Sequence, residues 1–174
     1  MRRVIVAPES PSLDGPVVFL AGPTWCAPGT APWHERALEL LGRLDPALHV
    51  ASPRRPLETE HDFDEAAYAE QVDWETAWLR RAGATGAVLF WLAREDHHRC
   101  HRPHAQTTRF ELGEWKEHAR AGARLVLGIE DGFSGARYVR RRFAQECPSV
   151  PILDTLESTC RAAVACARAG AARK

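Results

Sequence analysis

The sequence predicts a single α/β domain whose parallel sheet is covered by helices on both faces. Short apolar runs alternate with longer segments of helical periodicity along the 174 residues, an alternation typical of βαβ units. Residues 88–92 are apolar without a break, as expected for a strand that is buried on both faces. The length is about that of one domain, so we expect one domain over residues 1–174.

The elements follow in order along the chain. Strand-like runs lie at residues 4–7, 17–21, 49–51, 87–93 and 125–129, with a further run of two residues at 152–153. Helical periodicity lies at residues 32–44, 64–82, 109–121, 135–147 and 155–169. This order predicts a doubly wound, flavodoxin-like parallel sheet of about five strands flanked by helices. Ligands bind beyond the carboxyl ends of such strands, so we expect the site at the loops after residues 21 and 93.

The composition argues against nucleic acid and membranes as partners. Lys and Arg total 23 and Asp and Glu total 23, so no basic surplus attracts a phosphate backbone or an anionic membrane. No apolar run approaches the roughly 20 residues of a membrane span, and the apolar stretch near the N-terminus is too short for a signal peptide. The 5 cysteines include no CxxC pair and fit neither a zinc cluster nor a secreted disulfide framework. We expect a cytoplasmic protein.

The first segment that indicates chemistry is Phe-Leu-Ala-Gly-Pro-Thr at residues 19–24, followed by Trp25. Gly22 and Pro23 end the predicted strand and allow close approach of a ligand to the backbone, while Trp25 can stack on a planar ring. The alternative is an ordinary turn with a packed tryptophan. The segment is no phosphate loop, because neither GxGxxG nor GxxxxGK[ST] is present.

The second segment is the predicted helix around Glu75. Tyr68, Val72, Glu75 and Leu79 share one face at helical spacing, so Glu75 lies in a mostly apolar stripe. A carboxylate there must pair with a cation, take up a proton or face a cavity. Glu75 is therefore a candidate acid–base residue with a raised pKa, and the alternative is a structural pair with an arginine.

The third segment, residues 107–115, reads Thr-Thr-Arg-Phe-Glu-Leu-Gly-Glu-Trp. Thr108 and Glu111 have the spacing of a capping box, which predicts a helix start and a structural role for Glu111. Glu111 in the first turn would alternatively lie at the positive end of the helix dipole, beside the ligand crevice, where the ionised form is favoured. An ionised carboxylate there suits nucleophilic attack on the anomeric carbon of a sugar. Both interpretations stay open.

The loop at residues 94–104 contains four histidines and Cys100. Its spacing fits no zinc signature, and the neighbouring arginines would repel a cation. We expect an active-site flap there, and neither a metal nor a cofactor.

Together these segments resemble the nucleoside 2-deoxyribosyltransferase superfamily, and within it the nucleoside 2-deoxyribosyltransferase-like branch. The resemblance covers roughly residues 4–140 and depends on FLAGPT at 19–24, QVDWE at 71–75 and TTRFELGEW at 107–115, in that order. It implies a flavodoxin-like fold and an enzyme that exchanges nucleobases on (2′-deoxy)nucleosides through a covalent glycosyl-glutamate intermediate. Phe19 stands where well-studied relatives have a tyrosine.

The resemblance also implies roles for single residues. Glu111 matches the nucleophile, and Glu75 matches the residue that handles the proton of the base, with Asp73 as the alternative. Gly22 and Pro23 match the turn that lines the base site. Two further expected substrate contacts are Trp91, at the end of its strand, and Asp96, for which Glu95 is the alternative.

Two other functions remain open. Thr107, Thr108 and Arg109 offer hydroxyls, a cation and backbone N–H groups at a helix start, a possible seat for a 5′-phosphate. The first alternative is therefore an N-glycosidase that hydrolyses nucleoside 5′-monophosphates, and the second is a catalytically silent nucleotide-binding module. A homo-oligomer is expected from the resemblance and from 6 tryptophans, more aromatic surface than one small core readily hides.

Overall fold

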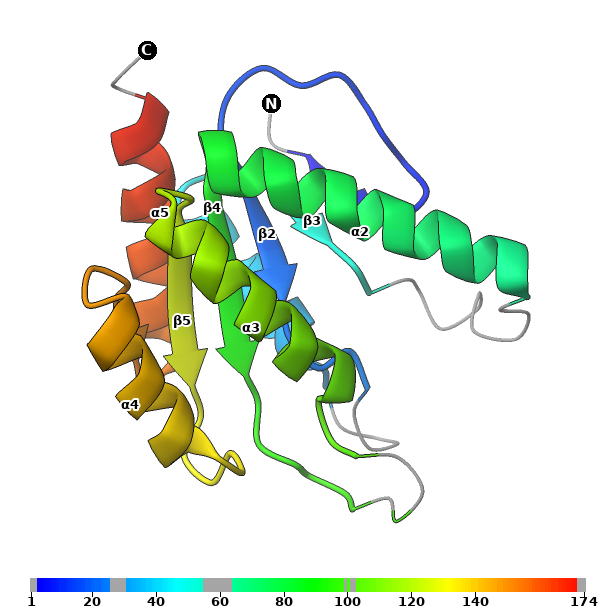
Figure 1. Cartoon of the computed structure of the whole chain (residues 1–174). Coiled ribbons are helices and arrows are strands. Elements are labelled where there is room, and N and C mark those ends of the chain that lie inside the picture. Colours follow the sequence, from blue (N-terminus) through cyan, green and yellow to red (C-terminus); the bar gives the residue numbers. More distant parts are fainter. Residues whose placement is uncertain (1–2, 26–30, 55–63, 99, 101–102, 172–174) are drawn as a thin grey trace.

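The computed structural model describes residues 3–25, 31–54, 64–98, 100 and 103–171, and it contains one parallel sheet between two layers of helices (Figure 1). The strands are β1 (Val4–Val6), β2 (Val17–Ala21), β3 (His49–Ser52), β4 (Ala87–Leu92), β5 (Leu125–Ile129) and β6 (Ile152–Leu153). The helices are α1 (Trp33–Leu44), α2 (Glu65–Thr85), α3 (Gln106–Arg120), α4 (Ala136–Glu146) and α5 (Leu156–Ala171).

The sheet has the order β1-β3-β2-β4-β5-β6, with every pair parallel. This order confirms the doubly wound, flavodoxin-like prediction, with six strands in place of about five because the two-residue run at 152–153 also pairs, as β6. The chain continues from β2 to β3 on one side and from β4 to β5 on the other. The strand order therefore reverses between β2 and β4, and a crevice is expected at their carboxyl ends.

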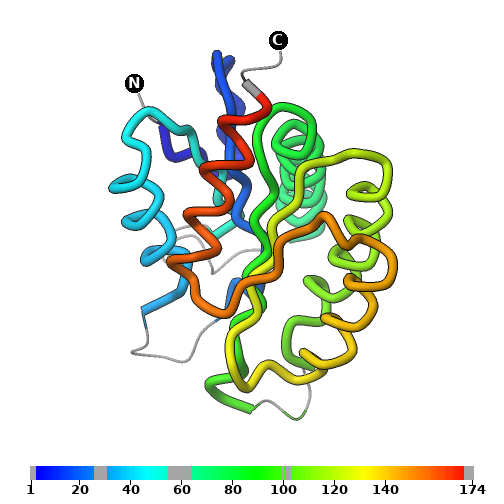
Figure 2. The backbone as a smooth tube through the Cα atoms, turned by 90° about the vertical axis from the view of Figure 1, so that its left-hand side faces the viewer, coloured from blue at the N-terminus to red at the C-terminus, as the bar shows by residue number. Residues whose placement is uncertain are grey.

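Helices cover both faces of the sheet (Figure 2). Helices α2, α3 and α4 pack on one face, and α1 and α5 pack on the other. Successive residues of β4 alternate between the two cores, so that Phe90 contributes to the first core and Leu89 and Trp91 to the second. Burial on both faces explains why this strand is uninterruptedly apolar in the sequence.

The tryptophans are distributed over both cores. Trp74, Trp78, Trp91 and Trp115 are buried, whereas Trp25 and Trp33 are partly exposed. The expectation that the core of one domain could not bury most of the tryptophans was wrong. A sheet that is covered on both faces has two cores, and together they bury four of the six. The homo-oligomer remains a prediction from the resemblance alone.

The helix ends have local causes. Asp64 caps α2, since its side-chain oxygen accepts a hydrogen bond of 2.8 Å from the backbone N–H of Ala67. Helix α3 begins at Gln106, three residues before the predicted start. Within the described ranges, no helix is both long enough and apolar enough to cross a membrane.

The imidazole of His34 is an unusual group in the second core. It lies in the first turn of α1, is 1% exposed, and packs against the ring of Trp33 with 3.8 Å between centroids. Neither ring nitrogen has a hydrogen-bond partner in the described part of the chain. Burial, with a smaller contribution from the charge of Arg54, lowers the pKa of His34 from its usual 6.5 to about 3.

This burial predicts a specific sensitivity to acid. The folded state keeps His34 neutral while the unfolded chain takes up its proton near pH 6.5, so the stability is complete above pH 6.5 and is lost as the pH falls toward 3. Between pH 6.5 and 5 the loss is about 2 kcal/mol. Urea unfolding of His34→Leu is expected to lack this loss, whereas His98→Leu, at an exposed histidine, retains it. Equal losses in wild type and His34→Leu would contradict the prediction.

Candidate active site

A cavity of about 210 Å³ lies where the carboxyl ends of β2 and β4 approach the start of α3. It is formed by segments that are distant in the sequence and lies beside the two loops at which the sequence predicts the site. The lining residues are Phe19, Ala21, Gly22, Pro23, Thr24, Trp25, Pro53, Glu75, Glu95, His97, Pro103, His104, Ala105, Gln106, Thr107, Thr108 and Glu111.

The cavity contains most of the predicted site residues. Those that line it are Gly22, Pro23, Trp25, Glu75, Thr107, Thr108 and Glu111. Those that do not line it are Asp73, Trp91, Asp96 and Arg109. Both candidate carboxylates are thus brought to one place from two different helices.

The turn after β2 is held against the body of the protein by tryptophans. The indole N–H of Trp33 donates to the carbonyl oxygen of Pro23 at 2.8 Å. A Cβ atom on Gly22 would lie 2.4 Å from the carbonyl oxygen of Trp91 and 2.7 Å from the ring of Trp33, so no side chain fits at this position. Gly22 is required for this close packing, which fixes the turn that lines the cavity.

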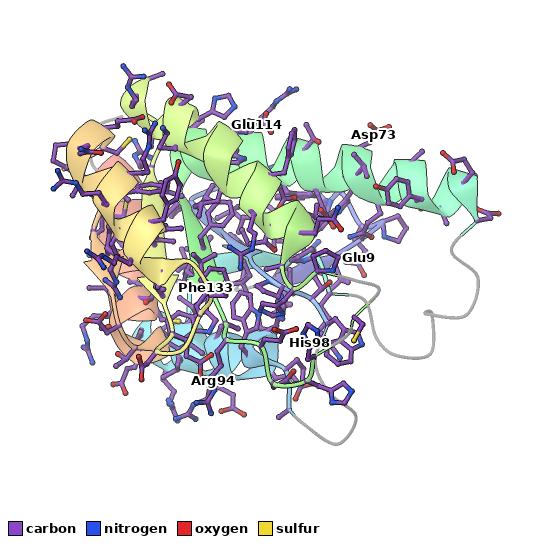
Figure 3. All side chains as sticks on the ribbon, turned by 60° about the horizontal axis from the view of Figure 1, so that its bottom comes forward. Glu9, Asp73, Arg94, His98, Glu114 and Phe133 are labelled. Atoms are coloured by element: carbon purple, nitrogen blue, oxygen red, sulfur yellow. The ribbon has the colours of Figure 1, made fainter. Side chains whose placement is uncertain are left out.

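Three predicted substrate contacts lie elsewhere. The side chain of Trp91 is buried in the core beneath α1 and α5, because alternate residues of β4 face opposite sides of the sheet. Asp73 is exposed on the outer side of α2 (Figure 3), two residues from Glu75 and therefore on another face of the helix. Asp96 is exposed and does not line the cavity, whereas its alternative, Glu95, does.

Arg109 also differs from its prediction. Its guanidinium lies over the ring of Phe133 at 4.5 Å, donates to the carbonyl oxygen of Ser134 at 3.0 Å, and donates to that of His104 at 3.3 Å. Phe133 belongs to the loop after β5, below the start of α3 (Figure 3). Arg109 therefore connects the segment before α3 to the loop after β5, and its own side chain does not line the cavity.

The start of α3 overturns the capping-box interpretation. The helix begins at Gln106, and the residue before it, Ala105, has φ 55°, a left-handed conformation that is costly for alanine. No side chain caps the helix. Thr108 is its third residue and is buried, and Glu111 is its sixth, which leaves the Glu111 side chain to line the cavity.

The environment of Glu111 raises its pKa to about 7. Burial is the largest cause, the negative charge of Glu75 is the second, and that of Glu114 on the same helix is the third. The sequence predicted the raised pKa for Glu75 and an ionised Glu111 at the helix dipole. The dipole acts mainly within the first turn, which Glu111 lies beyond. A carboxyl that keeps a proton near neutral pH beside a second carboxylate is typical of an acid–base pair.

Glu75 lies at the border between the buried and exposed faces of α2. The predicted apolar stripe was wrong, since Tyr68 is 57% and Val72 is 42% exposed. The buried residues of the helix are Gln71, Trp74, Trp78, Leu79, Ala82 and Gly83. The first turns of α2 extend beyond the sheet, and residues 65–70 are exposed or half-buried (Figure 1). Glu75 reaches the cavity, and its Oε1 accepts a hydrogen bond of 2.7 Å from the amide of Gln71.

Planar side chains that the sequence did not assign complete the walls. The ring of His97 lies 6.0 Å from that of Trp25, and Phe19, which is 2% exposed, forms part of the wall at the end of β2. The ring nitrogen Nε2 of His104 lies 2.8 Å from the carbonyl oxygen of Ala93, which orients the imidazole. The histidine-rich composition of the loop was the only signal for His97 and His104.

A metal centre finds no support in the described residues. Among them, no group of three or more histidine, cysteine, aspartate or glutamate side chains converges to bind an ion. His101, from the histidine-rich loop, lies outside the described residues, as do Arg99 and Arg102.

Comparison with known protein families gives no match, and neither does comparison with curated proteins. The function of this cavity is therefore inferred from its own residues together with the resemblance of the three motifs.

The coupling between the two carboxyls can be measured directly. Glu75→Gln removes the second cause of the raised pKa, so the pKa of Glu111 is expected to fall from about 7 by roughly one unit, while burial keeps it above 4.5. The measurement is a ¹³C NMR titration of protein labelled at the glutamate carboxyls, with the Glu111 signal identified by its loss in Glu111→Gln. Asp73→Asn, which removes one charge from the exposed face of α2, is the matched control. The same shift in both variants would show a general charge effect instead.

Proposed function

We propose that this chain is an enzyme that acts on the N-glycosidic bond of a (2′-deoxy)nucleoside and exchanges its nucleobase through a covalent glycosyl intermediate on Glu111. The observation that carries the proposal is the pairing of Glu111 with Glu75 in one cavity at the reversal of strand order. The resemblance of the three motifs supports the same reaction. No cofactor is required for it.

The singly protonated carboxyl pair supplies the one proton that this reaction needs. In the first step, an oxygen of Glu111 forms a bond to the anomeric carbon as the bond from that carbon to the base nitrogen breaks. The proton of Glu111 passes through Glu75 to the departing nitrogen, so the base leaves uncharged. In the second step, the nitrogen of a new base replaces the Glu111 oxygen on the anomeric carbon and returns its proton to the pair.

The planar residues suit a nucleobase. Trp25 and His97 line the cavity with their rings 6.0 Å apart, and Phe19 and Pro23 add apolar surface at the end of β2. Aromatic rings stack on flat heterocycles through dispersion and quadrupole interactions. We assign the base to this side of the cavity and the anomeric carbon to the side of Glu111.

The charges of the lining favour a nucleoside over its 5′-monophosphate. Glu75, Glu95 and Glu111 line the cavity, and none of the described lining residues is a lysine or arginine. The start of α3, in contrast, favours the alternative, an N-glycosidase for 5′-monophosphates. It has no side-chain cap, and the Thr108 hydroxyl lies at the cavity, so its N–H groups suit an anion.

Product analysis separates these functions. The protein is incubated with a mixture of deoxynucleosides, nucleoside 5′-monophosphates and free bases, and the products are separated by chromatography. We expect new base-swapped nucleosides. Free base with sugar phosphate would establish the N-glycosidase instead, and an unchanged mixture would favour a catalytically silent nucleotide-binding module.

Glu111→Gln tests the nucleophile. The amide cannot form the glycosyl ester at a useful rate, so activity is expected to fall by at least about a thousandfold with an unchanged melting temperature. Glu117→Gln, an exposed acid on the same helix, is the control and should remain active. A 2-deoxy-2-fluoro nucleoside with a good leaving base should leave a sugar on the peptide containing Phe110-Glu111-Leu112, detected by mass spectrometry. An adduct on another carboxylate would refute the assignment.

The pH profile tests the shared proton. The pair loses this proton as the pH rises through the Glu111 pKa of about 7, so kcat/KM is expected to fall above that pH by about tenfold per unit. Below it, the proton is present and available for the departing base. A kcat/KM that instead rises through pH 7 would show that the active form is the fully ionised pair.

A further inference from the structure

Gln71 is a buried polar residue of α2 that the proposed mechanism does not use. It is 8% exposed and lies one helical turn before Glu75, on the face that packs against the sheet. Its amide nitrogen Nε2 donates to Oε1 of Glu75 at 2.7 Å and to the carbonyl oxygen of Pro53 at 3.0 Å. Both acceptor residues line the cavity.

These two hydrogen bonds determine the orientation of the amide. A side-chain amide nitrogen has two hydrogens, and here one goes to α2 and the other to the segment that follows β3. The orientation is therefore set by two walls of the cavity at once. The Oε1 atom of Glu75 can only accept from this nitrogen, and a donor stabilises an ionised carboxylate more than a protonated one.

We propose that Gln71 is a positioning residue that holds Glu75 ionised and in place beside Pro53, so that the single proton of the carboxyl pair stays on Glu111. With Glu75 ionised, its negative charge disfavours a second charge on Glu111, which is itself partly buried. Before substrate binds, Glu111, the proposed nucleophile, is thus protonated, and Glu75, the proposed proton-transfer residue, is ionised. The inference rests on the proposed function only where it assigns this proton to the departing base.

Other ionisable groups also face Glu111 and contribute to the distribution of the proton between Glu75 and Glu111. These groups are Glu114 on its own helix, Glu95 and His97 in the loop after β4, and His104 in the loop before α3. The hydrogen bonds that Gln71 donates to Glu75 and Pro53 do not involve these groups. We expect a substitution at Gln71 to act on the pair through its hydrogen bond to Glu75.

The test is Gln71→Met, which keeps much of the side-chain volume and removes both donors. The protonated fractions of Glu75 and Glu111 are measured at pH 6, without substrate, by ¹³C NMR of the glutamate carboxyls. We expect the protonated fraction of Glu75 to rise and that of Glu111 to fall relative to wild type. With substrate, kcat is expected to fall roughly ten- to a hundredfold, because Glu75 is no longer aligned.

Gln145→Met, at an exposed glutamine of α4, is the matched control and should leave both fractions unchanged. Gln71→Asn keeps an amide but is too short for the same contacts, and it is expected to shift the proton in the same direction should Gln71→Met not fold. Unchanged fractions in a folded Gln71 variant would overturn the inference, whatever the activity. A shifted proton in a protein without activity on nucleosides would overturn the proposed function and leave the role of Gln71 intact.

Discussion

The reversal of strand order between β2 and β4 is the constraint on which the rest of the site depends. The connections from these neighbouring strands lead to opposite sides of the sheet, so neither covers the carboxyl ends of both strands. The turn after β2, the loop after β4 and the start of α3 are brought to this uncovered edge. A cavity with walls from several segments follows from the winding of the chain, before any particular side chain is considered.

The fold brings two carboxyl groups into this cavity. Ionising both of them at once costs free energy, because their negative charges repel each other. Glu75 comes from α2 and Glu111 from α3, and both helices pack on the same face of the sheet. Burial removes water that would otherwise screen the two charges, so their mutual repulsion favours one shared proton. The hydrogen bond from Gln71 makes the pair unequal, and this inequality distinguishes a site with assigned roles from two interchangeable acids.

The walls of the cavity are held by contacts that lie outside it. Trp33 donates to the carbonyl oxygen of Pro23, and Arg109 connects the residues before α3 to the loop after β5 through Phe133 and two carbonyl oxygens. Each of these side chains acts at a loop, where the backbone has no partner in regular secondary structure. Ala105, in its left-handed conformation, lies between His104, whose carbonyl oxygen accepts from Arg109, and the first residue of α3.

The sequence by itself determined the alternation of strands and helices and the uninterrupted apolar strand, because these depend on local periodicity and residue type. Glu75 and Glu111 were selected by the resemblance of the motifs, since the apolar stripe and the capping box that also pointed to them were wrong. The buried side of α2, the start of α3 and the location of Arg109 required the tertiary structure. The stripe of Tyr68 and Val72 has helical spacing, yet those turns extend beyond the sheet and remain exposed. The raised pKa of Glu111 also required the tertiary structure, since burial and repulsion depend on distances between groups far apart in the chain.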